Sequence, residues 1–142
     1  MHYPIFDIMA NHVIIQPPIM QMETSVVHSE YLERAVTINI YMPSKIKYLD
    51  QVSLVLFNDG QDLIKMSFDE IFSDLLTSGS IEPIVCVGIH CGPERKMEYG
   101  TAYSADFNGR GAKAGLYSKF IFDELLPFIR KKYNAPSFKD KS

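Results

Sequence analysis

Two short and almost purely apolar segments, residues 52–57 (VSLVLF) and residues 84–89 (IVCVGI), constrain the fold of this chain more than any other feature. Both are rich in β-branched residues. Runs of this kind are typical of strands in a parallel sheet, because helices cover both faces of such a sheet and leave no exposed face for polar side chains. The two segments therefore predict central, parallel strands.

The segment between these two strands has the pattern of an amphipathic helix over residues 67–78. Ser67 and Glu70 have the spacing of a capping box at its start, and Gly79 is placed for a C-terminal cap. Strand, helix and strand together predict a right-handed βαβ unit. The apolar side chains that share one helix face are Phe68, Ile71, Phe72, Leu75 and Leu76.

Further elements are predicted on either side of this unit. Residues 36–42 alternate between apolar and polar side chains, which predicts a half-buried strand that ends at Pro43. Residues 21–27 predict a second strand that pairs with it as a hairpin or meander. Residues 116–133 have a helical stripe that Pro127 interrupts, and a kink or break is expected there because proline removes a helical hydrogen bond. Residues 134–142 are predicted to be a loop.

Together these elements predict an α/β fold with three layers, α/β/α, around a mixed sheet of about four strands. The chain has 142 residues, of which 46% are hydrophobic and 22% charged, so one folded domain is expected. Residues 1–20 are predicted to be an N-terminal extension, and residues 21–142 to be the domain itself.

Charge and cysteine content argue against several classes of protein. The net charge is −3, whereas nucleic-acid binding needs a strong positive excess. Cys86 and Cys91 lack the spacing of a zinc or redox motif and are expected to be free thiols in a reducing compartment. Residues 1–18 have no positively charged start, so neither a signal peptide nor a membrane span is predicted. We therefore expect a cytoplasmic protein that binds neither nucleic acid nor membrane.

Two stretches are candidates for a functional site. Residues 58–61 (NDGQ) follow the first central strand, where ligands of open α/β sheets bind, and Gly60 allows a sharp turn or a close approach. The alternative is an ordinary turn in which Asn58 and Asp59 bond to their own backbone. Residues 91–115 are long, rich in glycine and without a regular pattern, which is typical of a functional loop, with a solvated loop as the alternative.

Two other motifs are rejected. Residues 109–115 contain three glycines, but the third is one residue late for a dinucleotide-binding fingerprint and no strand precedes them. His90 and Cys91 are adjacent, so on a strand their side chains point to opposite faces and cannot easily share one metal ion. No metal site is predicted.

Several stretches resemble the putative esterase family of the α/β-hydrolase superfamily, which includes the enterochelin esterases and esterase D. The resemblance runs from Glu23 to the end of the chain, and its most specific part is FIFDELLPFIRKKY at residues 120–133. The other matching stretches are RAVTINIYMP at 34–43, LVLFNDGQD at 54–62, IEPIVCVGI at 81–89, and Arg95 with Glu98 and Tyr99.

The resemblance implies a serine hydrolase whose nucleophile elbow, G-x-S-x-G, follows the helix at residues 116–133, with the triad acid and histidine later still. This sequence contains no G-x-S-x-G, so no catalytic residue is assigned to it, and it is expected to be the N-terminal half of such a domain. The backbone amides of Gly60 and Gln61 match the family's first oxyanion-hole donor. No metal or organic cofactor is implied. The resemblance places the substrate pocket at Asn58, Asp59, Arg95, Glu98 and Tyr99.

The resemblance also implies an open sheet edge, since the family's next strand pairs beside residues 52–57, and an open edge favours a homo-oligomer. The leading hypothesis is half of an esterase that acts on small-molecule esters by serine acyl transfer and is inactive alone. The alternative is a non-catalytic binding or assembly module that uses the open edge or residues 91–115. A phosphate- or nucleotide-binding protein is disfavoured, because no glycine-rich loop leads into a helix N-terminus.

Overall fold

The centre of the fold is a mixed sheet, seen in a computed structural model that describes residues 19–46, 49–100, 109–134 and 138–139. Its strands are β1 (Met20–Ser29), β2 (Arg34–Pro43), β3 (Ser53–Asn58) and β4 (Ile84–Ile89), in the order β1-β2-β4-β3. β2 is antiparallel to both of its neighbours, whereas β3 and β4 are parallel. The predicted parallel pair is confirmed, but only β4 is central, because β3 is the outer strand of the described sheet. Helices cover both faces of an outer strand as well, so a continuous apolar run does not distinguish the two positions. Of the predicted N-terminal extension, residues 1–18 lie outside the described residues.

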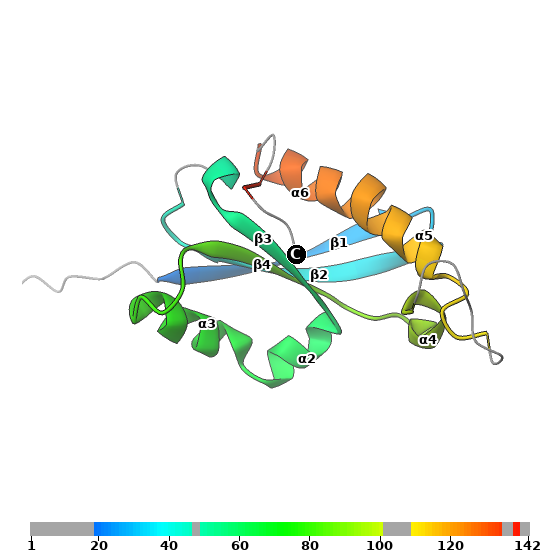
Figure 1. Cartoon of the computed structure of the whole chain (residues 1–142), viewed down its shortest axis with the longest axis horizontal. Helices are drawn as coiled ribbons and strands as arrows, with labels where there is room; N and C mark the ends of the chain where they lie inside the picture. Colours follow the sequence, from blue (N-terminus) through cyan, green and yellow to red (C-terminus); the bar gives the residue numbers. More distant parts are fainter. Residues whose placement is uncertain (1–18, 47–48, 101–108, 135–137, 140–142) are drawn as a thin grey trace, which may run out of the picture.

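Helices cover both faces of this sheet, which confirms the predicted three-layer α/β fold (Figure 1). On one face lie α2 (Gly60–Lys65) and α3 (Phe68–Thr77). On the other face α5 (Ala114–Lys119), η2 (Phe120–Leu125) and α6 (Leu126–Lys132) follow one another as one long helical segment. Two short helices are η1 (Leu49–Gln51), just before β3, and α4 (Arg95–Glu98), beyond the end of β4.

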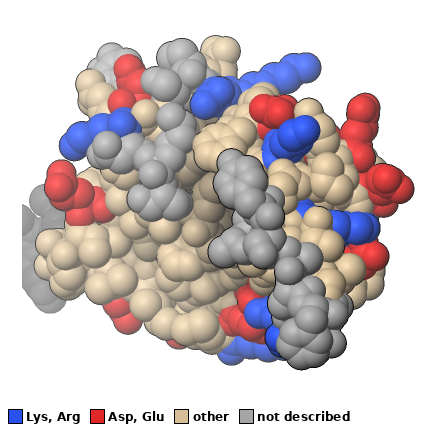
Figure 2. Space-filling view, turned by 45° about the vertical axis from the view of Figure 1, so that its right-hand side comes forward, with Lys and Arg blue, Asp and Glu red and all other residues tan. Residues whose placement is uncertain are grey.

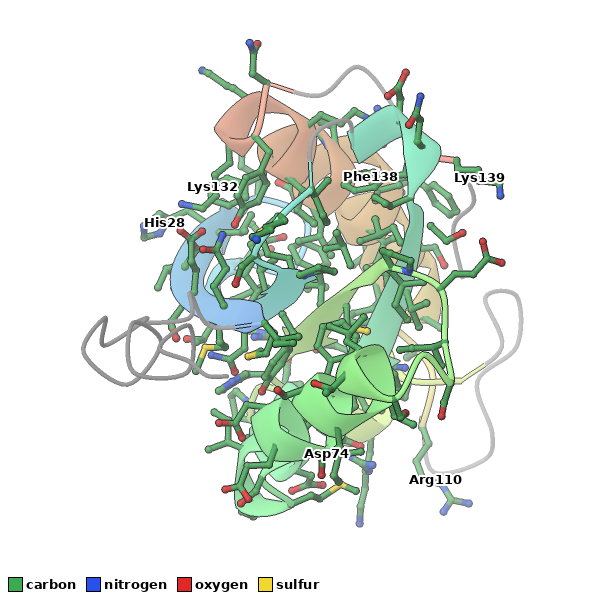
Figure 3. The ribbon with its side chains drawn as sticks, turned by 90° about the vertical axis from the view of Figure 1, so that its left-hand side faces the viewer. His28, Asp74, Arg110, Lys132, Phe138 and Lys139 are labelled. Carbon is green, nitrogen blue, oxygen red and sulfur yellow. The ribbon has the colours of Figure 1, made fainter. Side chains whose placement is uncertain are left out.

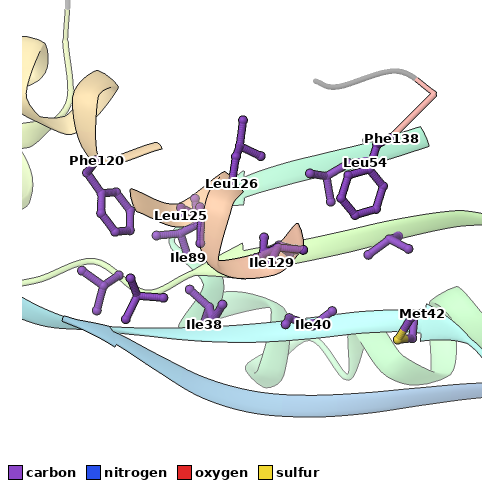
Figure 4. Packing of buried hydrophobic residues seen from close by; sticks show 14 of the residues in the cluster. Ile38, Ile40, Met42, Leu54, Ile89, Phe120, Leu125, Leu126, Ile129 and Phe138 are labelled. Atoms are coloured by element: carbon purple, nitrogen blue, oxygen red, sulfur yellow. The ribbon is translucent and has the colours of Figure 1, made fainter. Parts of the chain in front are cut away.

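Each face of the sheet has its own hydrophobic core. Between the sheet and the α5–α6 segment, apolar side chains of β2, β3 and β4 meet Phe120, Leu125 and Ile129, all fully buried (Figure 4). The core under α3 is smaller and aromatic, with Phe68 edge-on to Tyr41 at 5.0 Å between ring centroids. The prediction of a half-buried strand was therefore wrong for β2, because the second face of this inner strand is buried as well.

The helix predicted over residues 67–78 is present as α3, but it begins differently. Ser67 has a left-handed backbone (φ 53°), and its side chain makes no capping bond to α3, so the predicted capping box with Glu70 is absent from this described stretch. The reason is that α2 ends only two residues earlier, so Ser67 lies in the short link between the two helices. The predicted C-terminal cap is confirmed: Gly79 is left-handed, and the amides of Gly79 and Ser80 bond back into the last turn of the helix.

The second predicted helix begins at Ala114 and contains the predicted irregularity. Immediately before Pro127 the helix widens into the π-helical turn η2, and regular α-helix resumes at Leu126. Because Pro127 has no N–H for the carbonyl of Asp123, a change in the hydrogen-bond pattern at this point is expected.

Residues 138–139 are irregular, as the loop predicted for residues 134–142 requires, but they pack against the sheet. Phe138 is 4% exposed and lies beside Leu54 of β3 (Figure 4). The amide of Lys139 donates to the carbonyl of Val52 at 2.8 Å, so the two described residues dock at the start of the outer edge of β3 (Figure 3). An isolated aromatic residue gives no periodic signal in sequence, which explains why this packing was not predicted.

The long stretch at residues 91–115 is also more regular than predicted. It contains α4, and α5 begins within it at Ala114. Backbone bonds join the two, from the Gly111 amide to the Lys96 carbonyl at 2.8 Å and from the Lys113 amide to the Met97 carbonyl at 2.7 Å. Residues 101–108 lie outside the described residues.

Candidate functional site: the turn between β3 and α2

The candidate site is the turn at residues 58–61, which connects the C-terminal end of β3 to α2. Asp59 has a left-handed backbone (φ 55°, ψ 46°), a region that residues other than glycine seldom adopt. Gly60 and Gln61 follow as the first two residues of α2. In a helix the first amides have no carbonyl partner within the helix, so these two amides are hydrogen-bond donors at the end of β3.

Gly60 is required here by a close contact with β4. A Cβ atom on Gly60 would lie only 2.4 Å from the carbonyl carbon of Gly88, well inside van der Waals contact. The start of α2 therefore rests directly on the backbone of β4. The sequence predicted that Gly60 allows a sharp turn or a close approach to a ligand. The structure shows instead a close approach to the backbone of β4, and Asp59 makes the left-handed turn.

Arg95 of α4 holds the side chain of Asp59 in a two-pronged ion pair. Its Nε donates to Oδ1 at 2.7 Å and its Nη2 to Oδ2 at 2.5 Å. The Arg95 guanidinium keeps the pKa of the Asp59 carboxyl below its usual value. The guanidinium also lies over the ring of Tyr99, 5.0 Å from the centroid, and the Tyr99 hydroxyl oxygen accepts from the Asp59 amide at 3.3 Å. The predicted residues Asp59, Arg95 and Tyr99 are thus in direct contact.

Asn58 is fixed by a residue that the sequence assigned only to a helix stripe. The Tyr117 hydroxyl of α5 donates to Asn58 Oδ1 at 2.7 Å, and its ring packs edge-on against Tyr99 with centroids 5.3 Å apart. Burial raises the pKa of the Tyr117 hydroxyl, so it remains a protonated donor. No signal in the sequence distinguishes this tyrosine from an ordinary core residue.

Gln61 connects the turn to the residue that follows β4. Its side-chain Nε2 donates to Cys91 Sγ at 2.9 Å, and its Oε1 accepts from the Cys91 amide at 3.1 Å. The neighbouring His90 faces elsewhere and bonds through Nε2 to Asn39 Oδ1 at 2.5 Å, while burial lowers the pKa of its ring. The expectation that His90 and Cys91 point to different faces is confirmed.

Glu98, the remaining residue of the predicted pocket, belongs to a neighbouring buried ion pair. Its side chain is 1% exposed and binds Arg34 of β2, with Nε to Oε2 at 3.0 Å and Nη2 to Oε1 at 2.7 Å. Gly92 leaves the room for this guanidinium, since a Cβ there would lie 2.6 Å from Arg34 Nε. The pair anchors α4 to the sheet, and with it Arg95 and Tyr99. A role for Glu98 in binding substrate stays a prediction.

Other features bear on what the site can do. Within the described ranges, no group of three or more His, Cys, Asp or Glu side chains is arranged to hold a metal ion. No helix in the same part of the chain is long and apolar enough to cross a membrane. On the face drawn in Figure 2, acidic and basic side chains are interspersed rather than gathered into one field.

Comparisons with known proteins place this arrangement in a family. The fold is similar to that of an IroE-like serine hydrolase from Shewanella oneidensis (22% identity, TM-score 0.61), with 79% of this chain covering 39% of that one. It is also similar to the BES protein from Bacillus cereus (21% identity, TM-score 0.63), with 89% of this chain covering 49% of that one. A third similar structure is the enterochelin esterase from Shigella flexneri (18% identity, TM-score 0.59), with 81% of this chain covering 26% of that one.

The chain thus spans less than half the length of these three proteins. A search of curated proteins found no match. The family model described as "Putative esterase" matches residues 29–139, which include every strand from β2 onward and the whole turn at residues 58–61. The chain therefore belongs to the putative esterase family.

Proposed function

We propose that this chain supplies the oxyanion-binding turn of a serine carboxylic ester hydrolase. The observation that carries the proposal is the pair of amides of Gly60 and Gln61, which lie at the end of β3 in a turn fixed by contacts on several sides. Membership of the esterase family supports ester substrates of low molecular mass. The serine, the histidine and the acid of the triad lie outside this sequence, which has no G-x-S-x-G.

The proposed chemistry is acyl transfer. A serine attacks the ester carbonyl, the histidine takes the serine proton and passes it to the leaving alcohol, and negative charge develops on the carbonyl oxygen. The Gly60 and Gln61 amides donate to that oxygen as the charge develops. Losing one such donor costs about 3–4 kcal/mol of transition-state stabilisation. No step requires a metal or an organic cofactor.

The proposed acyl pocket adjoins this turn. Asn58, Asp59, Arg95 and Tyr99 lie together around it, and Glu98 holds the same short helix in place. Because the Arg95 side chain is 51% exposed, it presents cationic and aromatic surface together with Tyr99 beside the turn. These residues are proposed to contact the substrate.

A second candidate is a binding or assembly module, which one observation favours. β3 is the outer strand in the described sheet, and Lys139 bonds to the carbonyl of Val52 at the start of its outer edge. The outer edge of a sheet can act as a template for another strand. A homo-oligomer formed there is proposed as the alternative to catalysis.

The experiment that tests the esterase proposal has two parts. The purified 142-residue chain is assayed with a p-nitrophenyl ester and a fluorophosphonate serine probe, and we expect neither turnover nor labelling. The reading frame after codon 142 is then sequenced and the longer product assayed. An in-frame G-x-S-x-G within about 10 codons, and hydrolysis by that product, are expected from the family layout. A longer product that contains this motif and folds, but hydrolyses no ester, would refute the proposal.

A further inference from the structure

We propose that Arg95 and Tyr99 are positioning residues that hold Asp59 in its left-handed conformation and keep its carboxylate away from the amides of Gly60 and Gln61. The catalytic meaning of this inference rests on the proposed function. Its structural content, which concerns the residues around one turn, does not.

Asp59 does not act as an ordinary helix cap. An aspartate directly before a helix usually has an extended backbone, and its carboxylate accepts from the amide of the second or third helical residue. Asp59 precedes α2 but is left-handed, and within this described turn its carboxylate makes no capping bond. Both carboxylate oxygens bind Arg95 instead. The amide of Gln61, the second residue of α2, is thereby left without its usual side-chain acceptor.

The backbone of Asp59 is bonded on both sides. Its amide donates to the Tyr99 hydroxyl at 3.3 Å, and its carbonyl accepts from the Asp62 amide at 2.8 Å. The Tyr99 hydroxyl also approaches Asp59 Oδ1 at 3.4 Å. Tyr99 therefore contacts both the backbone and the side chain of Asp59 in its left-handed conformation.

The partners of Asp59 are themselves fixed. α4 is anchored by the buried pair of Glu98 and Arg34, and Tyr99 packs against Tyr117 of α5. Arg95 offers a planar fork that matches the two carboxylate oxygens, which a lysine cannot do. The fork is therefore held in place by contacts that do not involve Asp59.

These contacts predict the effect of removing the fork. In Arg95→Ala the carboxylate of Asp59 is released, the residue relaxes to an extended backbone, and the carboxylate caps the Gln61 amide. The amide that the proposed function needs would then be occupied by the protein's own side chain. A purely structural ion pair predicts the opposite result, a looser turn whose amides exchange faster.

The test is amide hydrogen exchange of the ¹⁵N-labelled 142-residue chain, with the ¹³Cα shift of Asp59 as a reporter of its backbone. In Arg95→Ala we expect the Gln61 amide to exchange about fivefold more slowly, the size of effect that a side-chain cap gives. In Asp59→Gly with Arg95→Ala no carboxylate remains, so exchange at Gln61 should return to the wild-type rate. Lys96→Ala, a neighbouring exposed residue of α4, is the matched control and should change nothing.

The outcomes separate clearly. Faster or unchanged exchange at Gln61 in Arg95→Ala, or no reversal in the double variant, would overturn the inference. If Arg95→Ala does not fold, two milder variants replace it. Arg95→Lys loses the two-pronged pair with Asp59, and Tyr99→Phe loses the hydroxyl that contacts the Asp59 amide and Oδ1. Both should slow exchange at Gln61, and unchanged or faster exchange would equally overturn the inference. Because no ester is hydrolysed in this experiment, its failure leaves the esterase proposal standing, and failure of the esterase assay leaves this result standing.

Discussion

The contact between Gly60 and Gly88 allows a sharp test of how the turn is built. In Gly60→Ala the new methyl carbon would lie 2.4 Å from the Gly88 carbonyl carbon, about 1 Å short of ordinary contact. The neighbour is backbone of a strand buried on both faces, so it cannot rotate away as a side chain would. Overpacking in such a place costs about 1–3 kcal/mol and occasionally more, and we expect a loss near 3 kcal/mol.

Gly79→Ala is the matched control, because it isolates backbone strain from steric overlap. Gly79 has φ +70°, but a Cβ there would meet nothing within 4 Å. A left-handed alanine costs about 1–2 kcal/mol. In both variants, alanine also lowers the entropy of the unfolded chain, which offsets each loss equally.

The assay is urea unfolding of the wild-type chain and both variants, followed by far-UV circular dichroism. We expect the unfolding midpoint of Gly60→Ala to be the lower of the two, with an unchanged slope, since the surface exposed on unfolding is the same. The amide signals of Gly88 and Ile89 should shift in Gly60→Ala only. If Gly60→Ala loses no more stability than Gly79→Ala, α2 does not rest on β4 as described, and the account of the turn is wrong.

Three further predictions concern the surroundings of the site. Phe138→Ala should cost about 3 kcal/mol in urea unfolding, as expected for a buried aromatic side chain, whereas Phe122→Ala, at 66% exposure, should cost under about 0.5 kcal/mol; equal effects would contradict docking at β3. Glu98→Ala leaves the Arg34 guanidinium without its buried partner and should cost about 3–5 kcal/mol, so a loss below about 1 kcal/mol would show that the pair is solvated. Burial lowers the pKa of His90, so near pH 6.5 and below the unfolded state binds more protons than the folded state. The free energy of unfolding should therefore fall as the pH drops through 6.5. The same pH dependence in His90→Asn would refute this prediction.

Local patterns predicted the framework of the fold because the framework is itself local. The continuous apolar runs at residues 52–57 and 84–89 became β3 and β4, and the helical stripe between them became α3. α2 was missed because six residues are too few to complete an apolar period. The prediction of a capping box at Ser67 was wrong for a related reason. Its spacing was correct, but the missed helix before it imposed a left-handed backbone on the capping residue.

The sequence predicted where the candidate site lies in the chain but not which residues contact one another there. Residues 58–61 follow the apolar run that forms β3, and the resemblance to a family added Arg95 and Tyr99, which the structure brings to Asp59. The contacts of Tyr117 and Cys91 with the turn were not predicted. A helix stripe fully explains the tyrosine, and the cysteine was considered only as a free thiol and as a neighbour of His90. Their bonds to Asn58 and Gln61 span 59 and 30 residues.

The conformation of the turn is therefore a property of the assembled fold rather than of its own four residues. A left-handed Asp59 is unfavourable by itself, and the contacts that hold it come from Arg95, Tyr99 and the backbone of Gly88, all later in the chain. These partners are in place only after β4 has paired with β3 and α4 has docked through Glu98. Without these partners, an aspartate at this position is expected to adopt an extended backbone and cap its own helix. The packing around β4 and α4 thus sets the direction of the two amides, on which the proposed chemistry depends. A substitution in that packing should alter the turn even where the substituted residue does not contact residues 58–61.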